Sequence, residues 1–200
     1  MTIDQVRDAY SRRAAEYVEV LGRIEHAAEA DRAAILAWAR SADGPILDVG
    51  CGPGQWTNLL HEAGLYVEGI DPVEAFLDDA RVRYPAARFR LGRAEELGVP
   101  DGSLGGVLAW FSLIHTDPAE IDLPLQALAR SLRAGGSLAI GFFDGPPREP
   151  FDHAVVTAYF WSVDALTEVV EGVGLTITGT ATRHDPPARP QGLLIAQKIT

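Results

Sequence analysis

The sequence predicts an α/β fold in which a doubly wound, mostly parallel sheet of seven strands follows two helices. From residue 46 onward, short apolar segments typical of strands alternate with segments of helical periodicity, which favours parallel strands joined by crossover helices. Residues 137–143 are apolar almost throughout, as expected of a central strand that is covered on both faces. The chain has 200 residues, of which 47% are hydrophobic, so we expect one domain over residues 1–200.

Two helices are predicted ahead of the first strand. Tyr10 and Tyr17 lie at helical spacing within a first helix over residues 3–22. A second helix is expected over residues 24–41, where apolar positions lie on one face and charged positions on the other. We expect these helices, within residues 1–42, to form an N-terminal cover over the sheet.

The alternating core contains further strands and helices in regular succession. Glycine or proline marks the end of most of them, as expected of residues that interrupt regular structure. The strands are expected at residues 46–50, 66–70, 87–91, 105–110 and 137–143, and the helices at residues 55–63, 73–83 and 118–133.

The alternation stops after the strand at 137–143. Residues 144–150 are rich in proline and glycine and cannot form regular structure, and several aromatic residues follow them. Two interpretations of segment 144–161 stay open: a lid or wall of a ligand pocket, and a packed surface loop with an edge strand near 154–160.

The C-terminal part returns to regular structure. Ser162 is a favourable N-cap for a helix over residues 163–173. Strands at about 175–183 and 192–198 flank a proline-rich loop, which suits a hairpin. We therefore expect an antiparallel last strand at one edge of the sheet.

Charge and composition exclude several classes of function. The formal net charge is −11, which argues against nucleic acid or an anionic membrane as the partner, since both attract cationic surfaces. Cys51 is the only cysteine, so no internal disulfide can form, and residues 1–7 lack the apolar core of a secretory signal. We expect a cytoplasmic protein. The five histidines show no metal-ligand spacing, so no metal is expected.

Residues 46–54, Ile-Leu-Asp-Val-Gly-Cys-Gly-Pro-Gly, are the most informative stretch of the chain. They indicate a buried strand that ends in a glycine loop, at the place where open α/β sheets bind ligands. The glycine spacing of a dinucleotide-binding loop fits from neither Gly50 nor Gly52, and no phosphate-loop lysine follows. Asp48 inside the strand supplies a negative charge, which suits a cationic ligand rather than a pyrophosphate.

The segment Asp-Val-Gly-Cys-Gly-Pro-Gly at residues 48–54 resembles the glycine loop of the class I S-adenosylmethionine-dependent methyltransferases, which have a Rossmann-like fold. The resemblance covers about residues 5–198. It implies S-adenosylmethionine as the methyl donor and S-adenosylhomocysteine as the product. Because little of the chain lies outside the core, we expect a small-molecule methyl acceptor, and a monomer or homodimer.

The same resemblance implies a set of residues that bind the donor. Asp71, after the second strand, would accept hydrogen bonds from both ribose hydroxyls, and Pro72 would lie beside the adenine. Ala94 and Glu95 would meet the adenine edge, whereas Arg93 stands where the family commonly has aspartate. The methionine half would be surrounded by Tyr10, Tyr17, Asp48, Gly50, Gly52, Gly54, Gln55, Trp56 and the backbone carbonyl of Trp110.

The acceptor site is expected in the less regular segments. His115, in the loop after the fourth strand, is a candidate general base, because an ordinary imidazole titrates near neutral pH. A structural role in packing that loop is the alternative, and methyl transfer can also proceed by alignment alone. The aromatic residues around the site predict an apolar or aromatic acceptor, contacted by His115, Phe143, Phe151, His153 and Tyr159.

Two other functions stay open at this stage. A non-catalytic S-adenosylmethionine-binding module would bind the donor without turnover. An NAD(P)-dependent oxidoreductase could use a similar sheet, although the glycine spacing counts against it.

Overall fold

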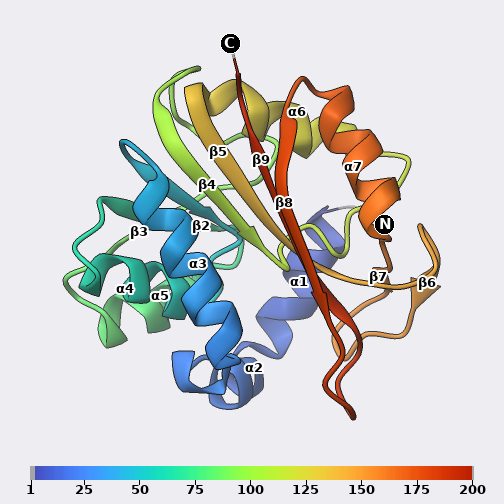
Figure 1. Ribbon diagram of the computed structural model, residues 1–200. Helices are drawn as coiled ribbons and strands as arrows, with labels where there is room; N and C mark the ends of the chain where they lie inside the picture. The colour runs from blue at the N-terminus through green and yellow to red at the C-terminus, as the bar shows by residue number, and fades with distance from the viewer. Residues whose placement is uncertain (1–2, 200) are drawn as a thin grey trace.

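The computed structural model describes residues 3–199 and, apart from positions 3, 15, 20 and 21, their side chains. Residues 1–2 of the predicted N-terminal cover lie outside this range. The centre of the molecule is a sheet in the order β3-β2-β1-β4-β5-β9-β8 (Figure 1). Its strands are β1 (Ile46–Val49), β2 (Val67–Asp71), β3 (Arg88–Leu91), β4 (Leu104–Trp110), β5 (Leu132–Phe143), β8 (Thr176–Arg183) and β9 (Gln191–Gln197).

The strand directions confirm the predicted sheet. The ladders from β3 to β5 are parallel, and β9 runs antiparallel to both β5 and β8. The seven-stranded, mostly parallel sheet and the antiparallel last strand are therefore as expected, but β9 lies between β5 and β8, so the edge strand is β8 and not the last strand. The carboxyl ends of the five parallel strands meet at one edge of the molecule, because parallel strands all point the same way.

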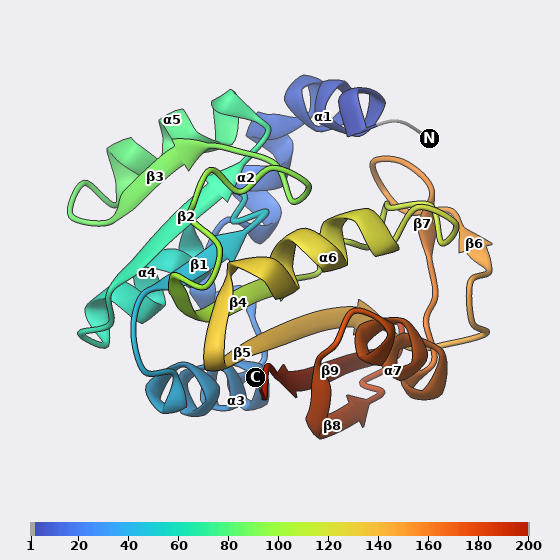
Figure 2. The ribbon, with the colours of Figure 1, turned by 90° about the horizontal axis from the view of Figure 1, so that it is seen from above.

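Helices cover both faces of this sheet. On one face, α3 (Glu29–Ser41) and α4 (Gln55–Glu62) bury their apolar side chains against β1, β2 and β4, and α5 (Glu74–Arg83) contacts β2 and β3. On the other face, α6 (Asp122–Ser131) and α7 (Val163–Gly172) pack against β4, β5 and β9. Figure 2 shows α3 and α6 on opposite faces of β4 and β5, which explains why these strands are apolar.

The N-terminal cover corrects the prediction of two continuous helices. The first divides at Arg13 into α1 (Ile3–Arg12) and α2 (Ala14–Leu21), and the second into a 3-10 turn (Ile24–His26) and α3. No helix-breaking residue marks the first division; the packing of Tyr10 and Tyr17 against Phe76 of α5 imposes it. As a result, α1 and α2 lie across the carboxyl ends of the strands (Figure 1).

The boundary between α6 and β5 also differs from the prediction. The helix expected over 118–133 is shorter, and β5 already begins at Leu132. Gly135 ends no helix: it has a φ of +78° inside the strand and donates its amide to the carbonyl of Lys198 at 2.7 Å. Near this point the register of β5 against β4 shifts, so the glycines allow an irregular strand start.

The insertion after β5 forms a small sheet of its own. Strands β6 (Pro150–Phe151) and β7 (Ala158–Tyr159) pair antiparallel. Of the edge strand expected near 154–160, only the two residues of β7 form a strand. The amide of Tyr159 donates to the carbonyl of Ile114 at 2.9 Å, which ties the insertion to the loop after β4. None of the described helices combines the length and apolarity needed to cross a membrane.

One glycine in the antiparallel part makes the packing testable. Gly192 of β9 lies opposite Phe142 of β5, and a Cβ at this glycine would lie 2.2 Å from the ring of that buried phenylalanine. We expect Gly192→Ala to lower the free energy of unfolding by about 1–3 kcal/mol, measured by urea denaturation. Gly179→Ala on the neighbouring β8, where a Cβ meets no atom within 4 Å, is the matched control. Equal losses in the two variants would contradict this account of the packing.

Candidate active site

A cavity of about 380 Å³ opens at the carboxyl ends of the parallel strands. Its walls come from the ends of β1, β2, β4 and β5, from α1 and α2, and from the insertion after β5. Most of the residues predicted for donor and acceptor line it: Tyr10, Tyr17, Asp48, Gly50, Gly52, Gln55, Trp56, Asp71, Pro72, Ala94, Trp110, His115, Phe143 and His153. Four predicted residues are not part of its lining: Gly54, Glu95, Phe151 and Tyr159.

The glycine loop forms a wall of backbone rather than of side chains. Gly50 has a φ of +70°, and a Cβ there would lie 2.3 Å from the Cβ of Ser112. Gly52 has a φ of +54°, and a Cβ there would meet no atom within 4 Å, so any side chain would project into open space. Gly54 lies behind the loop, where a Cβ would be 2.6 Å from the Phe89 ring. The first two glycines therefore shape the cavity, and the third permits close packing of α4 against β3.

Two buried carboxyl groups lie at the ends of β1 and β2. Asp48, which is 2% exposed, accepts a hydrogen bond from Thr57 Oγ1 at 2.7 Å. Asp71, which is 6% exposed, accepts from the amides of Gly52 at 2.9 Å and Val73 at 2.8 Å. Burial raises the pKa of Asp48 to about 7 and the pKa of Asp71 to about 6. A cation placed in the cavity would stabilise both ionised carboxylates, so the site favours a positively charged ligand.

A hydrogen-bonded chain joins α1, the loop after β4 and the insertion. The Tyr10 hydroxyl lies 2.7 Å from His115 Nε2, and His115 Nδ1 lies 2.8 Å from the carbonyl oxygen of Thr157. Because a carbonyl can only accept, Nδ1 carries the ring proton and Nε2 accepts from Tyr10. Burial lowers the pKa of His115 to about 4, so the imidazole is neutral at pH 7. In this arrangement both nitrogens are engaged, which favours the structural role for His115 over that of a base.

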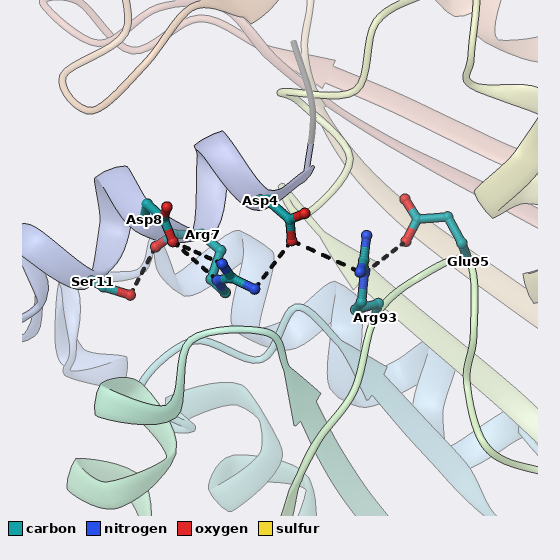
Figure 3. A network of polar contacts seen from close by, with 6 residues as sticks. All are labelled: Asp4, Arg7, Asp8, Ser11, Arg93 and Glu95. Carbon is teal, nitrogen blue, oxygen red and sulfur yellow. Dashed lines mark hydrogen bonds and ion pairs between the residues drawn. The ribbon is translucent and has the colours of Figure 1, made fainter.

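A second set of contacts anchors α1 on its solvent side. Figure 3 shows Arg7 paired with Asp4 at 3.1 Å and with Asp8 at 2.9 Å. Asp4 also lies 3.9 Å from Arg93 in the loop after β3, and Arg93 lies 3.9 Å from Glu95 (Figure 3). The pairs among Asp4, Arg7 and Asp8 are exposed and contribute little to stability. Glu95 Oε2 is buried and accepts no hydrogen bond from a described residue; the carboxylate lies beside Arg93, which itself lines the cavity.

Aromatic rings form the wall that faces the insertion. Trp110 packs on Trp56 with ring centroids 5.3 Å apart, and Phe111 packs on Phe143 at 5.0 Å. Phe143 in turn contacts Phe151 at 5.2 Å, so Phe151 supports the wall from outside the cavity. Phe111 is one of two non-glycine residues with positive φ among those described, at +54°. Such a conformation costs about 1–3 kcal/mol and is found where a site requires it.

Several lining residues escaped the sequence analysis because no local pattern marks them. Arg183 of β8 donates hydrogen bonds to Asp31 of α3 at 2.5 Å and to Gln191 of β9 at 2.6 Å. These three residues close the cavity between the β8–β9 hairpin and the N-terminal cover, across a long sequence separation. The lining residues that sequence reasoning missed include Arg7, Arg23, Asp31, Phe76, Arg183 and Gln191.

Comparison with known proteins identifies relatives of this chain. The family described as "Methyltransferase domain" matches residues 46–136. A probable S-adenosylmethionine-dependent methyltransferase of Mycolicibacterium smegmatis is 30% identical over 150 residues, which are 70% of this chain and 55% of the relative. A trans-aconitate 2-methyltransferase of Delftia acidovorans is 33% identical over 113 residues, which are 56% of this chain and 41% of the relative.

A solved structure has the same fold. The 1,6-didemethyltoxoflavin-N1-methyltransferase of Burkholderia thailandensis, crystallised with S-adenosylhomocysteine, superposes with a TM-score of 0.81. The two sequences are 22% identical, and the match covers 98% of this chain and 88% of that one. The chain spans between 38% and 55% of the length of the first curated relatives that it matches.

The buried carboxyl of Asp48 makes stability depend on pH in a definite direction. The pKa of Asp48 rises from 3.8 to about 7 on folding, so the folded protein holds the carboxyl proton more tightly than the unfolded chain does. The free energy of unfolding gained from this tighter proton binding is fully present below pH 3.8 and is lost as the pH rises through 7. Asn at this position can still accept the hydrogen bond from Thr57 but carries no charge. We therefore expect Asp48→Asn to raise the Tm of the ligand-free protein at pH 8, with a much smaller difference at pH 4.5, in differential scanning calorimetry. Asp78→Asn on α5, where the side chain is 70% exposed, is the control. A Tm for Asp48→Asn that is unchanged or lower at pH 8 would contradict the prediction.

Proposed function

We propose that this chain, as a class I S-adenosylmethionine-dependent methyltransferase, transfers a methyl group from S-adenosylmethionine to a small-molecule acceptor, releasing S-adenosylhomocysteine. The observation that carries this proposal is the buried Asp48 carboxyl in the same cavity as the open glycine loop. The donor has a sulfonium and an ammonium and no phosphate, which matches an acidic, glycine-walled pocket.

The residues present fit this donor. Each oxygen of Asp71 accepts one backbone amide and keeps a lone pair, so both can also accept a ribose hydroxyl. Pro72, Val73 and Ala94 line the cavity beside Asp71 and would form an apolar wall for the adenine. The space over Gly52 is where the backbone of the loop could approach the donor closely.

The chain's contribution to the reaction is mainly alignment and exclusion of water. The donor supplies a methyl carbon that is electrophilic because it is bonded to a positively charged sulfur. Trp110 and Phe111, at the end of β4, and Phe143, at the end of β5, present an apolar surface to the acceptor. Such a surface excludes water and holds a nucleophile in line with the methyl group, which can supply much of the rate enhancement.

The walls of the site support a small acceptor. The cavity has to hold the donor as well as the acceptor, and residues of α1, α2 and the insertion wall it in, which favours a compact molecule over a polymer. The name of the Delftia relative also describes a small acceptor, trans-aconitate. The aromatic wall of this chain favours an apolar or aromatic acceptor instead.

Donor binding is tested by removing the predicted ribose carboxylate. We expect Asp71→Ala to weaken binding of S-adenosylmethionine by at least about tenfold in isothermal titration calorimetry, because two charge-assisted hydrogen bonds are lost. The control is Asp78→Ala, which removes an exposed carboxylate from α5 and should leave the affinity unchanged. Far-ultraviolet circular dichroism checks that both variants are folded.

Three outcomes would count against the proposal. Unchanged affinity in Asp71→Ala would show that the donor site is placed wrongly. Tight donor binding without release of S-adenosylhomocysteine on any acceptor would indicate a binding module. Binding of NAD(P)H in place of S-adenosylmethionine would indicate an oxidoreductase.

A further inference from the structure

Gln191, the first residue of β9, lines the cavity with a side-chain amide whose orientation is fixed. Its Oε1 atom accepts a hydrogen bond from Arg183 Nη2 at 2.6 Å. Because a guanidinium only donates, the amide oxygen has to face Arg183, and the Nε2 group is turned away from it. Nε2 donates to none of the described residues and keeps accessible surface. Gln191 therefore offers a hydrogen-bond donor that a ligand in the cavity can use.

Arg183 is itself held in place, which makes this donor rigid. Its Nε atom donates to Asp31 Oδ1 at 3.1 Å, its Nη2 atom donates to Asp31 Oδ2, and its Nη1 atom donates to Asp185. The planar guanidinium is thus fixed from two sides, and it fixes the amide of Gln191 in turn. The two carboxylates also offset the positive charge of Arg183, so this group does not turn the end of the cavity into a site for an anion.

The register of the sheet places this donor beside the aromatic wall. Gln191 pairs with Phe143 of β5 on one side and with Arg183 of β8 on the other. Directly paired residues of antiparallel strands lie about 5 Å apart, with their side chains on the same face of the sheet. All three residues line the cavity. An aromatic ligand that lies on the Phe143 ring would therefore bring one edge within reach of Gln191 Nε2.

We propose that Gln191 determines which methyl acceptor binds, by donating a hydrogen bond from Nε2 to a carbonyl oxygen or ring nitrogen of an aromatic molecule. This inference rests on the methyltransferase function proposed above and names the acceptor class of that same site. A ligand with an N–H group at this position would place donor against donor and leave both unpaired. A ligand carboxylate would lie close to Asp31, which also lines the cavity.

The first experiment compares three probes that share one aromatic ring system. Binding of 2-acetylnaphthalene, 2-aminonaphthalene and 2-naphthoate to the chain saturated with S-adenosylhomocysteine is measured by isothermal titration calorimetry at pH 7. We expect the ketone to bind at least about fivefold more tightly than the other two probes, because it alone supplies an uncharged oxygen. Equal affinities, or tighter binding of the amine or the carboxylate, would overturn the proposed class.

The second experiment inverts the hydrogen-bonding character of the residue without changing its shape. In Gln191→Glu, one carboxylate oxygen still accepts from Arg183, but the other now offers an acceptor where Nε2 offered a donor. We expect the order to reverse, so that 2-aminonaphthalene binds more tightly than 2-acetylnaphthalene. A merely structural role for Gln191 would not produce this reversal, and an unchanged order would refute the proposal.

Two further variants guard this test. Gln126→Glu makes the same chemical change at an exposed position of α6 and should keep the wild-type order. Gln191→Met has neither donor nor acceptor at the end of its side chain and should bind the ketone and the amine with similar affinity. This variant decides the question if Gln191→Glu does not fold, which circular dichroism would reveal. A wild-type preference for the ketone in Gln191→Met would also refute the proposal.

Donor binding separates this inference from the function on which it rests. We expect Gln191→Met to bind S-adenosylmethionine as tightly as the wild type does. A loss of donor affinity would place Gln191 in the donor half of the cavity and overturn its assignment to the methyl acceptor. If the wild type binds the donor but does not distinguish the probes, this inference fails alone. If the wild type fails to bind the donor, the proposed function itself fails.

Discussion

The buried chain of hydrogen bonds from Tyr10 through His115 to Thr157 holds the site together. It links three segments that lie far apart in the sequence: the N-terminal helix, the loop after β4 and the insertion after β5. The last two are also joined by the hydrogen bond from the Tyr159 amide to the Ile114 carbonyl. The exposed ion pair between Asp4 and Arg93 also reaches α1, but solvent weakens it. Neutral hydrogen bonds in a buried environment are stronger and leave costly unpaired groups when broken. The roof of the cavity therefore depends on a neutral histidine, and the low pKa of His115 keeps it neutral.

The same site contains features that destabilise the free protein. Asp48 and Asp71 are buried with raised pKa values, and Phe111 has a backbone conformation that side chains rarely adopt. The two apolar layers between the sheet and its helices offset this cost, since most of the large buried side chains lie there. The strained backbone and the unneutralised acids lie around one cavity, where a cationic ligand would stabilise the acids, and such costs are common at functional sites.

The sequence identifies the donor side of the site better than the acceptor side, for a physical reason. The glycine loop and Asp71 follow directly from strand ends, so their positions depend on local pattern and on the common direction of parallel strands. The division of the first helix at Arg13 and the contact of Arg183 with Asp31 depend on packing between distant segments. The orientation of Glu95 toward Arg93 is likewise a tertiary effect, which no spacing within its own loop indicates.

This difference also limits what relatives can reveal about the acceptor. The family match covers residues 46–136, which contain the glycine loop, Asp71 and the loop after β4. Phe143 and His153 lie outside it and line the part of the cavity that is expected to touch the acceptor, and Tyr10, which is predicted to touch the donor, lies outside it as well. The match therefore covers most of the proposed donor site, whereas Phe143 and Phe151 of the aromatic wall lie outside the matched residues. The chemistry of the acceptor has to be derived from those segments themselves, and there the packed rings of Phe111, Phe143 and Phe151 favour an apolar or aromatic ligand.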